Sequence, residues 1–481
     1  MVSERVTPQP GPITAHDTET RSRPVLAWGM TAMLLGVMLI AYLDKAILGL
    51  VAQPAMAELG LSAAEFGAIS SAAGLLGPLS VFLYALVADR LPVKATLFTA
   101  VVVWSLLQLP VFFAASGALL LVTRFMLGAA EGPATPAAYT TAYSWWPNER
   151  RGLPTALLTT GASFGKLIFA PPLALIIAAF GWETGFVAVA LLGLAWAVGW
   201  RFIGREGPHG QADAGRAAGP AAEAAPGQAA AGLVAEAAPG QAAAGRVAGP
   251  VAQAAPRAPI RSILLTGTFA GFVAASTASA TLAIVVLTWL PSYFQVSLGF
   301  SAVAAGSLFG VPSIAAMVFL YGFGAWSDRM LKRGTAARRA RGLLGGALLA
   351  LGGVFLAALP LSSGVAVPIA LLMLGYGLAI SVNAVLNPAL VQIVPAGQQR
   401  SVLSIGLAAT GVLAAAGPLI TGHVLDGARA TGALADGYTT VFVLTGVVAL
   451  AGGALFALLV NPERDAAKVE AARLARGSKG V

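Results

Sequence analysis

Two side chains of opposite charge interrupt an apolar stretch in the first half of the chain. Arg124 and Glu131 stand in RFMLGAAEG (124–132), where the other residues are apolar or small. On a helix, seven residues correspond to about 700° of rotation, so both side chains project from nearly one face, about 10 Å apart along the axis. Charges in a lipid-length helix are costly unless compensated. The spacing therefore indicates either an ion pair kept for structure alone, or an anion site at Arg124 with a proton site at Glu131.

Three further ionisable residues lie in apolar stretches of the same half: Asp44, Lys45 and Lys166. A buried carboxyl group near cations can exchange a proton near neutral pH, so Asp44 and Glu131 are the candidates for proton coupling. Three cations against two acids leave this half with a net positive charge, which favours an anionic substrate. Asp44 and Lys45 are adjacent and point about 100° apart on a helix, so they cannot both face a cavity squarely. Asp44 is the better functional candidate of the two.

These charges suggest a coupling hypothesis. We expect the substrate and Glu131 to compete for Arg124, so that protonation of the acid frees the cation for an incoming carboxylate. Coupled transport follows if only the empty, deprotonated form and the loaded, protonated form change sides easily.

Lys166 lies in GASFGKLIF (161–169) and shares a helix face with Thr159 and Ser163. A lysine among hydroxyl groups is suited to bind a carboxylate, but a lysine that pairs with an acid on a neighbouring helix would fit the same pattern.

The second half offers neutral polar residues instead of charges. Asn383 and Asn387 are four residues apart and share a helix face, and Ser276 lies in an earlier apolar stretch. They can hydrogen-bond a substrate, and they can equally join helices within the membrane. The complete set of substrate-binding candidates is Arg124, Lys166, Lys45, Thr159, Ser163, Asn383, Asn387 and Ser276.

The elements that position these residues must be membrane-spanning helices. Of the 481 residues, 57% are hydrophobic and only 10% are charged, against about one quarter charged in soluble domains. Runs of about 20 apolar residues recur, each long enough to cross a hydrocarbon core of about 30 Å. They predict an all-α polytopic membrane protein with twelve transmembrane helices, at about 25–50, 66–87, 95–115, 118–142, 153–178, 185–203, 262–290, 303–326, 342–360, 366–393, 402–424 and 438–460.

Most of the 29 Lys and Arg residues lie in the two tails and in alternate links between these spans. By the positive-inside rule, this bias predicts a multi-pass protein of the plasma membrane, the inner membrane in bacteria, with both termini in the cytoplasm. The formal charge of +9 is then a signal of topology rather than of nucleic-acid binding.

A segment rich in Ala, Gly, Pro and Gln separates the two halves, and AEAAPGQAAAG occurs in it at 222–232 and again at 235–245. Its composition is typical of a flexible tether, with a regulatory docking site as the alternative. The predicted parts are a cytoplasmic N-tail (1–24), a six-helix bundle (25–204), a low-complexity cytoplasmic linker (205–259), a second six-helix bundle (260–460) and a cytoplasmic C-tail (461–481).

The two halves share a short motif. ALVADRLPVK (85–94) follows the second span of the first half, and GAWSDRMLKR (324–333) follows the second span of the second half. This repetition predicts two pseudo-symmetric six-helix bundles around a central site, as in secondary transporters. The charged residues at these helix ends are candidates for gating ion pairs, although the cations also fit a purely topogenic role: Asp89, Arg90, Glu149, Arg150, Arg151, Asp328 and Arg329.

At these motifs the sequence resembles the major facilitator superfamily over almost all of residues 25–460. Within it, the chain is most similar to the anion:cation symporter family, which includes bacterial sugar-acid and phthalate permeases. The similarity rests on YLDK (42–45), RFMLGAAEGPATP (124–136), WWPNERRG (145–152) and WLPSYF (289–294). The resemblance implies proton coupling at Asp44 and Glu131, and organic-anion binding or coupling at Arg124. Lys45 stands where the family usually has Arg.

The sequence therefore predicts a secondary active transporter, a proton-coupled symporter of an organic carboxylate such as a sugar acid, an aromatic acid or a small hydroxy acid. A proton-coupled drug or metabolite exporter of the same superfamily is the alternative, although Lys166 would repel a cationic drug. No nucleophile elbow, phosphate loop or metal-ligand cluster is present, so we expect no enzyme, no ATP-driven pump, no metal and no cofactor other than the coupling proton. We expect a monomer whose partners are the small organic anion and membrane lipid.

Overall fold

The computed structural model describes residues 15–87, 91–146, 152–208, 258–395 and 398–477, and every regular element in these ranges is a helix. The first half contains α1 (Ala15–Leu59), α2 (Ala63–Val87), α3 (Val93–Gln108), α4 (Pro110–Phe113), α5 (Gly117–Glu131), α6 (Ala134–Trp145), α7 (Gly152–Phe180) and α8 (Trp182–Ile203). The second half contains α10 (Ile260–Leu264), α11 (Gly267–Val296), α12 (Ala302–Leu308), α13 (Val311–Lys332), the π-helical turn η4 (Arg338–Leu343), α14 (Leu344–Ala357), the 3₁₀ turn η5 (Leu359–Leu361), α15 (Ala366–Ser381), α16 (Asn383–Gln392), α17 (Gln399–Ala430), α18 (Leu434–Leu459) and α19 (Pro462–Gly477).

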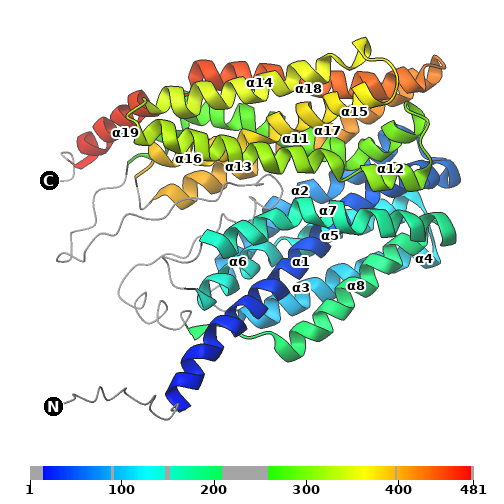
Figure 1. The fold of residues 1–481 in the computed structure, drawn as a ribbon, viewed down its shortest axis with the longest axis horizontal. Coiled ribbons are helices and arrows are strands. Elements are labelled where there is room, and N and C mark those ends of the chain that lie inside the picture. Colours follow the sequence, from blue (N-terminus) through cyan, green and yellow to red (C-terminus); the bar gives the residue numbers. More distant parts are fainter. Residues whose placement is uncertain (1–14, 88–90, 147–151, 209–257, 396–397, 478–481) are drawn as a thin grey trace, which may run out of the picture.

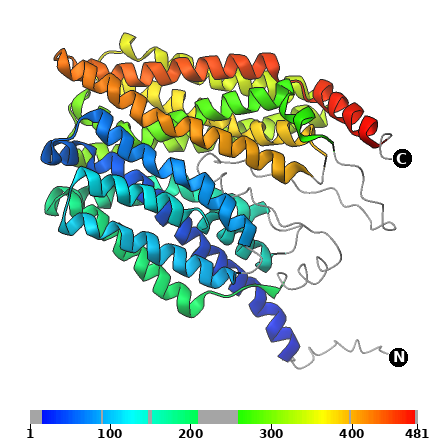
Figure 2. The same cartoon turned by 180° about the vertical axis from the view of Figure 1, so that it is seen from behind.

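The helices form two bundles that lie side by side, one from each half of the chain (Figure 1). Both views show that α1 begins and α19 ends at the same end of the molecule, which we call the terminal end (Figure 2). The opposite end is called the far end. The predicted linker is mostly outside the described residues, since only 205–208 and 258–259 belong to them.

Each of the twelve predicted spans corresponds to helical structure. Within the described residues, ten helical segments are long and apolar enough to cross a membrane, and Phe164–Phe180 in α7 is a shorter apolar helix. The remaining predicted span, 118–142, is made of α5 and α6. The predicted boundaries of the first span were too narrow: α1 runs from Ala15 to Leu59 rather than over 25–50. Helical hydrogen bonding continues into flanking polar residues, which an apolar run does not reveal.

The two bundles are joined at the far end, where α2 begins against α17. The first N–H groups of a helix lack partners within it, and the backbone N–H groups of Ala63 and Ala64 donate to the two carboxylate oxygens of Asp426, at 2.7 and 2.9 Å. One turn further along α2, a Cβ on Gly67 would lie 2.2 Å from the carbonyl oxygen of Pro418. A carboxylate from one bundle therefore caps a helix of the other, and only glycine permits the backbones to approach so closely.

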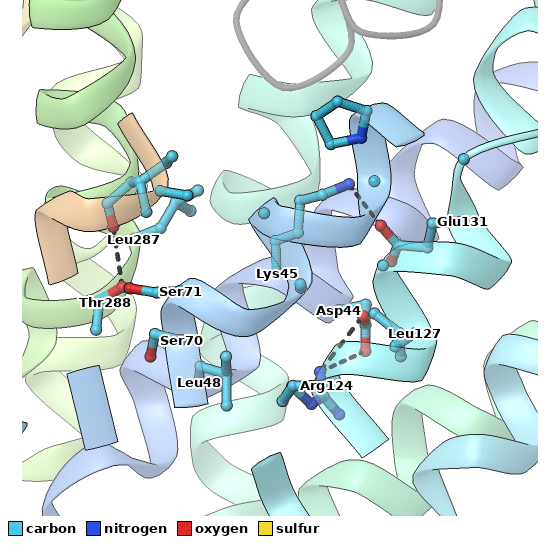
Figure 3. Close-up of a pocket in the computed structure, with 18 of the residues that line it drawn as sticks. Asp44, Lys45, Leu48, Ser70, Ser71, Arg124, Leu127, Glu131, Leu287 and Thr288 are labelled. Atoms are coloured by element: carbon cyan, nitrogen blue, oxygen red, sulfur yellow. Dashed lines mark hydrogen bonds and ion pairs between the residues drawn. The ribbon is translucent and has the colours of Figure 1, made fainter. Parts of the chain in front are cut away.

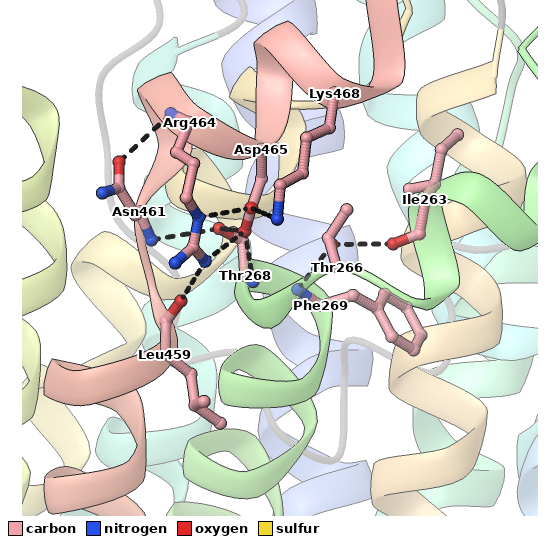
Figure 4. Close-up of polar contacts among 9 residues, drawn as sticks. All are labelled: Ile263, Thr266, Thr268, Phe269, Leu459, Asn461, Arg464, Asp465 and Lys468. Atoms are coloured by element: carbon pink, nitrogen blue, oxygen red, sulfur yellow. Dashed lines mark hydrogen bonds and ion pairs between the residues drawn. The ribbon is translucent and has the colours of Figure 1, made fainter. Parts of the chain in front are cut away.

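The segment predicted only as a C-tail contains a helix, α19, which packs against the terminal end of the second bundle (Figure 4). The buried carboxylate of Asp465 accepts hydrogen bonds from the backbone N–H and the hydroxyl of Thr268, both at 2.8 Å, and from Arg464 Nε at 2.9 Å. Burial raises the pKa of Asp465, but the hydrogen bonds from Arg464 and Thr268 outweigh it and hold the pKa below its usual value. Asp465 thereby caps the start of α11.

Candidate functional site

A cavity lies between the two bundles and is lined by α1, α2, α5 and the start of α6 of the first half and by α11 and α17 of the second (Figure 3). Its volume of about 90 Å³ is enough for several water molecules. The polar part of its wall comes almost entirely from the first bundle, whereas the second contributes apolar groups and one hydroxyl. The polar residues of the wall are Asp44, Lys45, Ser70, Ser71, Arg124, Glu131, Thr135 and Thr288.

Four ionisable side chains of this wall form two ion pairs between α1 and α5. Arg124 Nη1 lies 3.4 Å from Asp44 Oδ1, and Lys45 Nζ lies 2.9 Å from Glu131 Oε2. The prediction that Glu131 competes with the substrate for Arg124 is therefore wrong, because the acid that pairs with Arg124 is Asp44. Asp44 and Lys45 point in different directions from neighbouring positions, so each contacts a different residue of α5. Both nevertheless line the cavity.

The two pairs differ in their access to solvent. Asp44 and Arg124 are 0% and 1% exposed, whereas Lys45 and Glu131 are 22% and 11% exposed. A buried pair loses much of its hydration, so its net contribution to stability is small while the cost of removing one partner is large. The Lys45–Glu131 pair is the one that water and protons reach more readily.

Three buried polar atoms of the cavity wall have no hydrogen-bond partner within the described part of the chain. They are Arg124 Nε, Glu131 Oε1 and Ser70 Oγ. An unsatisfied buried polar atom costs about 1–3 kcal/mol. The wall is therefore equipped to hydrogen-bond water or a ligand at each of these three points.

A neutral side chain, Gln108, connects the acid and the base of the buried pair. Its Oε1 accepts a hydrogen bond of 2.6 Å from Arg124 Nη2, and its Nε2 donates to Asp44 Oδ1. This residue was not among the predicted site residues. A single amide in the apolar stretch VVVWSLLQLP (101–110) was the signal, because a polar residue inside a membrane span is a functional candidate by default.

Glu131 is the last residue of α5, directly before a break in the predicted fourth span. Pro133 has no N–H to donate to the carbonyl of Ala129, four residues earlier, and the hydroxyl of Ser80 on α2 donates to that carbonyl instead. A Cβ on Gly128 would lie 2.2 Å from the carbonyl oxygen of Ala73, also on α2. The glycine thus allows the close approach of a neighbouring helix, which positions Glu131 at the cavity.

Lys166 does not belong to the cavity wall described above. Its Nζ lies 3.3 Å from the hydroxyl of Tyr376 and 5.4 Å from the centre of that ring, so it links α7 of the first bundle to α15 of the second. The prediction of a cavity with three cations is therefore wrong: the described wall carries two acids and two cations. The side chains of Thr159 and Ser163 lie outside the described residues.

The second-half candidates also lie outside this wall. Asn383 Nδ2 donates to Ser279 Oγ at 3.1 Å and to the carbonyl of Ile380 at 2.9 Å, which joins α16 to α11. This contact favours the helix-joining alternative for Asn383. Asn387 is half-buried and Ser276 is buried, and neither lines the cavity. Instead α11 contributes Thr288, which was not among the predicted residues.

The gating candidates fall mostly outside the described residues, which exclude Asp89, Arg90, Glu149, Arg150 and Arg151. Asp328 and Arg329 are exposed near the end of α13, and neither forms an ion pair with another described residue. In this structure the bundles are joined at the far end. Gating ion pairs at the terminal end would form in the alternative state, in which the bundles are joined at the terminal end instead. The gating role remains a prediction.

Comparison with known proteins gives a consistent picture. The family model described as Major Facilitator Superfamily matches residues 33–418. A probable sulfoacetate transporter of Cupriavidus necator is 27% identical over 439 residues, which cover 89% of this chain and 94% of the relative. A probable L-galactonate transporter of Escherichia coli is 24% identical over 471 residues, which cover 94% of this chain and 95% of that relative. A hexuronate transporter of Bacillus subtilis is 34% identical over 170 residues, which cover 35% of this chain and 40% of that relative.

Solved structures share the fold at low sequence identity. A bacterial homolog of the human lysosomal transporter Spinster, in an inward-facing and occupied conformation, has a TM-score of 0.70 at 17% identity, covering 89% of this chain and 96% of that chain. A D-xylose-proton symporter has a TM-score of 0.62 at 15% identity, covering 88% and 97%.

Proposed function

The chain belongs to the Major Facilitator Superfamily, and we propose that it carries one small organic carboxylate together with a proton. It is a multi-pass membrane transporter and not an enzyme. The observation that carries the proposal is the pair of ion pairs at the cavity, Asp44 with Arg124 and Lys45 with Glu131.

The charge balance of the cavity wall supports proton coupling. With both acids ionised, two acids and two cations cancel, so an anion gains little by entering. Protonation of Glu131 would release Lys45, and protonation of Asp44 would release Arg124. A released cation in a partly desolvated cavity attracts a carboxylate strongly, and Arg124 can bind it through two parallel hydrogen bonds. The anion and the proton therefore favour each other's binding.

Release follows the same logic in reverse. When the proton leaves, the regained carboxylate competes with the substrate for its cation, and the ion pair re-forms as the anion departs. The empty, deprotonated wall is neutral, which suits it to return across the membrane without cargo. Glu131, the more exposed acid, is the better entry for the proton, which must reach Asp44 before Arg124, with its unpartnered Nε, is released as the anchor for the carboxylate.

Alternating access requires the far-end contact to separate. The hydrogen bonds from Ala63 and Ala64 to Asp426 hold the bundles together there, so the structure corresponds to a state closed at the far end. Since basic residues concentrate in the tails and the alternate links, we assign the terminal end to the cytoplasm. The chain would then reside in the bacterial inner membrane in an inward-facing state.

The relatives' names support an organic anion as the substrate. The relatives reported above are named as transporters of sulfoacetate, L-galactonate and hexuronate, which are all organic acids. The wall favours the same class once an acid is protonated, because the cation that is then released would attract an anion and repel a cationic drug. An acidic group that reaches Arg124 is the feature that these substrates share.

Uptake into proteoliposomes tests the proposal. Labelled sulfoacetate, galactonate, a hexuronate and an aromatic acid are each offered outside, with and without an inward proton gradient. We expect at least one acid to accumulate with the gradient and to equilibrate without it. If no acid moves faster than in protein-free liposomes while a cationic dye is extruded, the exporter alternative replaces the proposal.

A further inference from the structure

We propose that Gln108 is a positioning residue that holds Arg124 in its substrate-binding orientation while Asp44 gains and loses a proton. The inference rests on the proposed function and adds to it a neutral side chain that keeps Arg124 in place. Gln108 is fully buried and is not part of the cavity wall, so it acts through Arg124 rather than on the substrate.

The distances indicate that the amide holds the guanidinium more closely than the carboxylate does. Arg124 Nη2 lies 2.6 Å from Gln108 Oε1, whereas Arg124 Nη1 lies 3.4 and 3.5 Å from the two oxygens of Asp44. The ring of Phe186 covers the guanidinium on another side, 5.1 Å from Cζ. Gln108 therefore makes the shortest polar contact with Arg124 in the described part of the chain.

An amide is suited to this place because it accepts and donates at once without carrying charge. Its oxygen holds Arg124 and its nitrogen holds Asp44. When Asp44 is protonated, the attraction between carboxylate and guanidinium disappears, but the amide oxygen still accepts from Arg124. The guanidinium then keeps its orientation at the moment when it is free to bind an anion.

The backbone fixes the amide at this position. Gln108 is the last residue of α3, and Pro110 begins α4 after a single intervening residue. The proline locks its own backbone angle φ and ends the preceding helix, so the side chain of Gln108 leaves from a defined point of the bundle. Such a support restricts the motion of Arg124 and lowers the entropy lost when a substrate binds.

The charged groups around this position come from α1 and α5. They are Asp44 and Lys45 on α1, and Arg124 and Glu131 on α5. The other helices that pack on α3 carry few charges: α4 and α6 contain no Asp, Glu, Lys or Arg, and α8 carries Glu183 in its first turn, three residues before Phe186, and Arg201 in its last turn. A titration introduced at position 108 would therefore report mainly on Asp44 and Arg124.

Two substitutions separate positioning from packing. Gln108→Met keeps the approximate size but removes both hydrogen bonds. Gln108→Glu keeps the shape. Its protonated carboxyl has an accepting oxygen and a donating group, as the amide has. Its ionised form would neutralise Arg124 and leave it unavailable to an anion. Ser105→Ala, on the same helix one turn earlier, is the matched control, because Ser105 is buried and its hydroxyl has no partner in the described chain.

The measurement is the rate of proton-driven uptake of the best acid from the panel, divided by the wild-type rate at each pH between 5 and 8. We expect Gln108→Met to be slower by roughly 10–100-fold at every pH, the scale of a lost hydrogen bond to a charged group. We expect Gln108→Glu to match it at pH 8 and to recover by at least roughly tenfold toward pH 5, because burial should raise the pKa of the introduced carboxyl from its ordinary value of about 4.3 into this range. Ser105→Ala should follow the wild type.

Uptake by Gln108→Met at more than about half the wild-type rate would overturn the inference, and so would a Gln108→Glu ratio that does not change with pH. If Gln108→Met does not fold, as judged by size-exclusion elution, the pH dependence of Gln108→Glu decides alone. A failure of the proposed function is distinguishable, because the wild-type protein would then show no proton-driven uptake.

Discussion

Lys45 and Glu131 face each other across the contact between α1 and α5, with Nζ and Oε2 2.9 Å apart. This pair leaves Arg124, on the same helix as Glu131, to Asp44. Each acid therefore neutralises a different cation. Protonation of Glu131 releases Lys45, whereas protonation of Asp44 releases Arg124.

Glu131→Gln is expected to uncouple transport. The neutral amide cannot exchange a proton, and Lys45 would attract an anion at any pH. With the membrane potential clamped at zero, wild-type protein should accumulate the acid up to about tenfold per unit of pH gradient, if one proton accompanies each anion. The variant should not accumulate it but should still exchange labelled for unlabelled acid. Glu183→Gln in the first turn of α8 is the control. Loss of exchange as complete as the loss of accumulation would show that Glu131 is not a proton site alone.

Removing one partner of the Lys45–Glu131 pair should destabilise the protein more than removing both. Lys45→Met leaves an unpaired carboxylate that is only 11% exposed, whereas Lys45→Met with Glu131→Gln leaves no charge. We expect the single variant to unfold at lower temperature, by a free-energy difference on the order of 1–2 kcal/mol after allowance for solvent screening. Thermal unfolding in detergent over a complete double-mutant cycle measures this coupling. Additive effects of the two substitutions would contradict the pairing.

Asp426→Asn should loosen the far-end contact. The variant replaces a carboxylate that caps the start of α2 across the bundle interface, a contact worth roughly 1–2 kcal/mol. Because the chain has no cysteine, Ala63→Cys provides a single label at this contact. We expect a membrane-impermeant maleimide to react at least roughly fivefold faster in Asp426→Asn than in the parent, as the open population rises.

Asp436→Asn is the matched control for this measurement. Asp436 is an exposed acid in the first turn of α18, and its carboxylate makes no hydrogen bond or ion pair with the described residues. Equal labelling rates in both variants would mean that Asp426 does not hold the bundles together.

Asp465 should stabilise the docking of α19 at neutral pH and cease to do so in acid. Its folded pKa lies below the ordinary value of 3.8, so the stabilisation is present above about pH 4 and is lost as the pH falls through the folded pKa. Asp465→Asn is expected to speed hydrogen exchange of the Thr268 amide, which donates to this carboxylate. The ratio of exchange rates between variant and wild type should stay constant from pH 5 to 8. A ratio that falls between pH 8 and pH 5 would contradict the lowered pKa.

The sequence was sufficient to predict the helical fold and to single out the charged residues that line the cavity. Apolar runs of membrane length produce the helices, and Asp44, Lys45, Arg124 and Glu131 were conspicuous because charges are costly in such runs. Their pairing was not predictable, because it depends on how α1 is rotated against α5. The close contact of Gly128 with Ala73 sets how α5 lies against α2, but it does not place α1, and it exists only in three dimensions.

Other parts of the site and fold were missed for different physical reasons. Gln108 is neutral, so it produces no charge pattern, although it contacts both members of the buried pair. Lys166 was placed in the cavity because its helix face carries hydroxyls, but its long side chain reaches Tyr376 on the other bundle instead. α19 was missed because it is rich in charged residues and has no apolar run, and its docking depends on two acids that cap other helices, Glu463 and Asp465.

Simultaneous recording of the anion and the proton in proteoliposomes shows most directly whether the two cross together. A pH indicator is enclosed in vesicles that contain the wild-type protein, the membrane potential is clamped at zero, and a labelled acid transported by the protein is added outside without a pH gradient. We expect the vesicle interior to acidify as the acid enters, in constant proportion, and we expect Glu131→Gln to import the acid without acidification. Entry of the acid into wild-type vesicles with no change of internal pH would contradict proton-coupled transport.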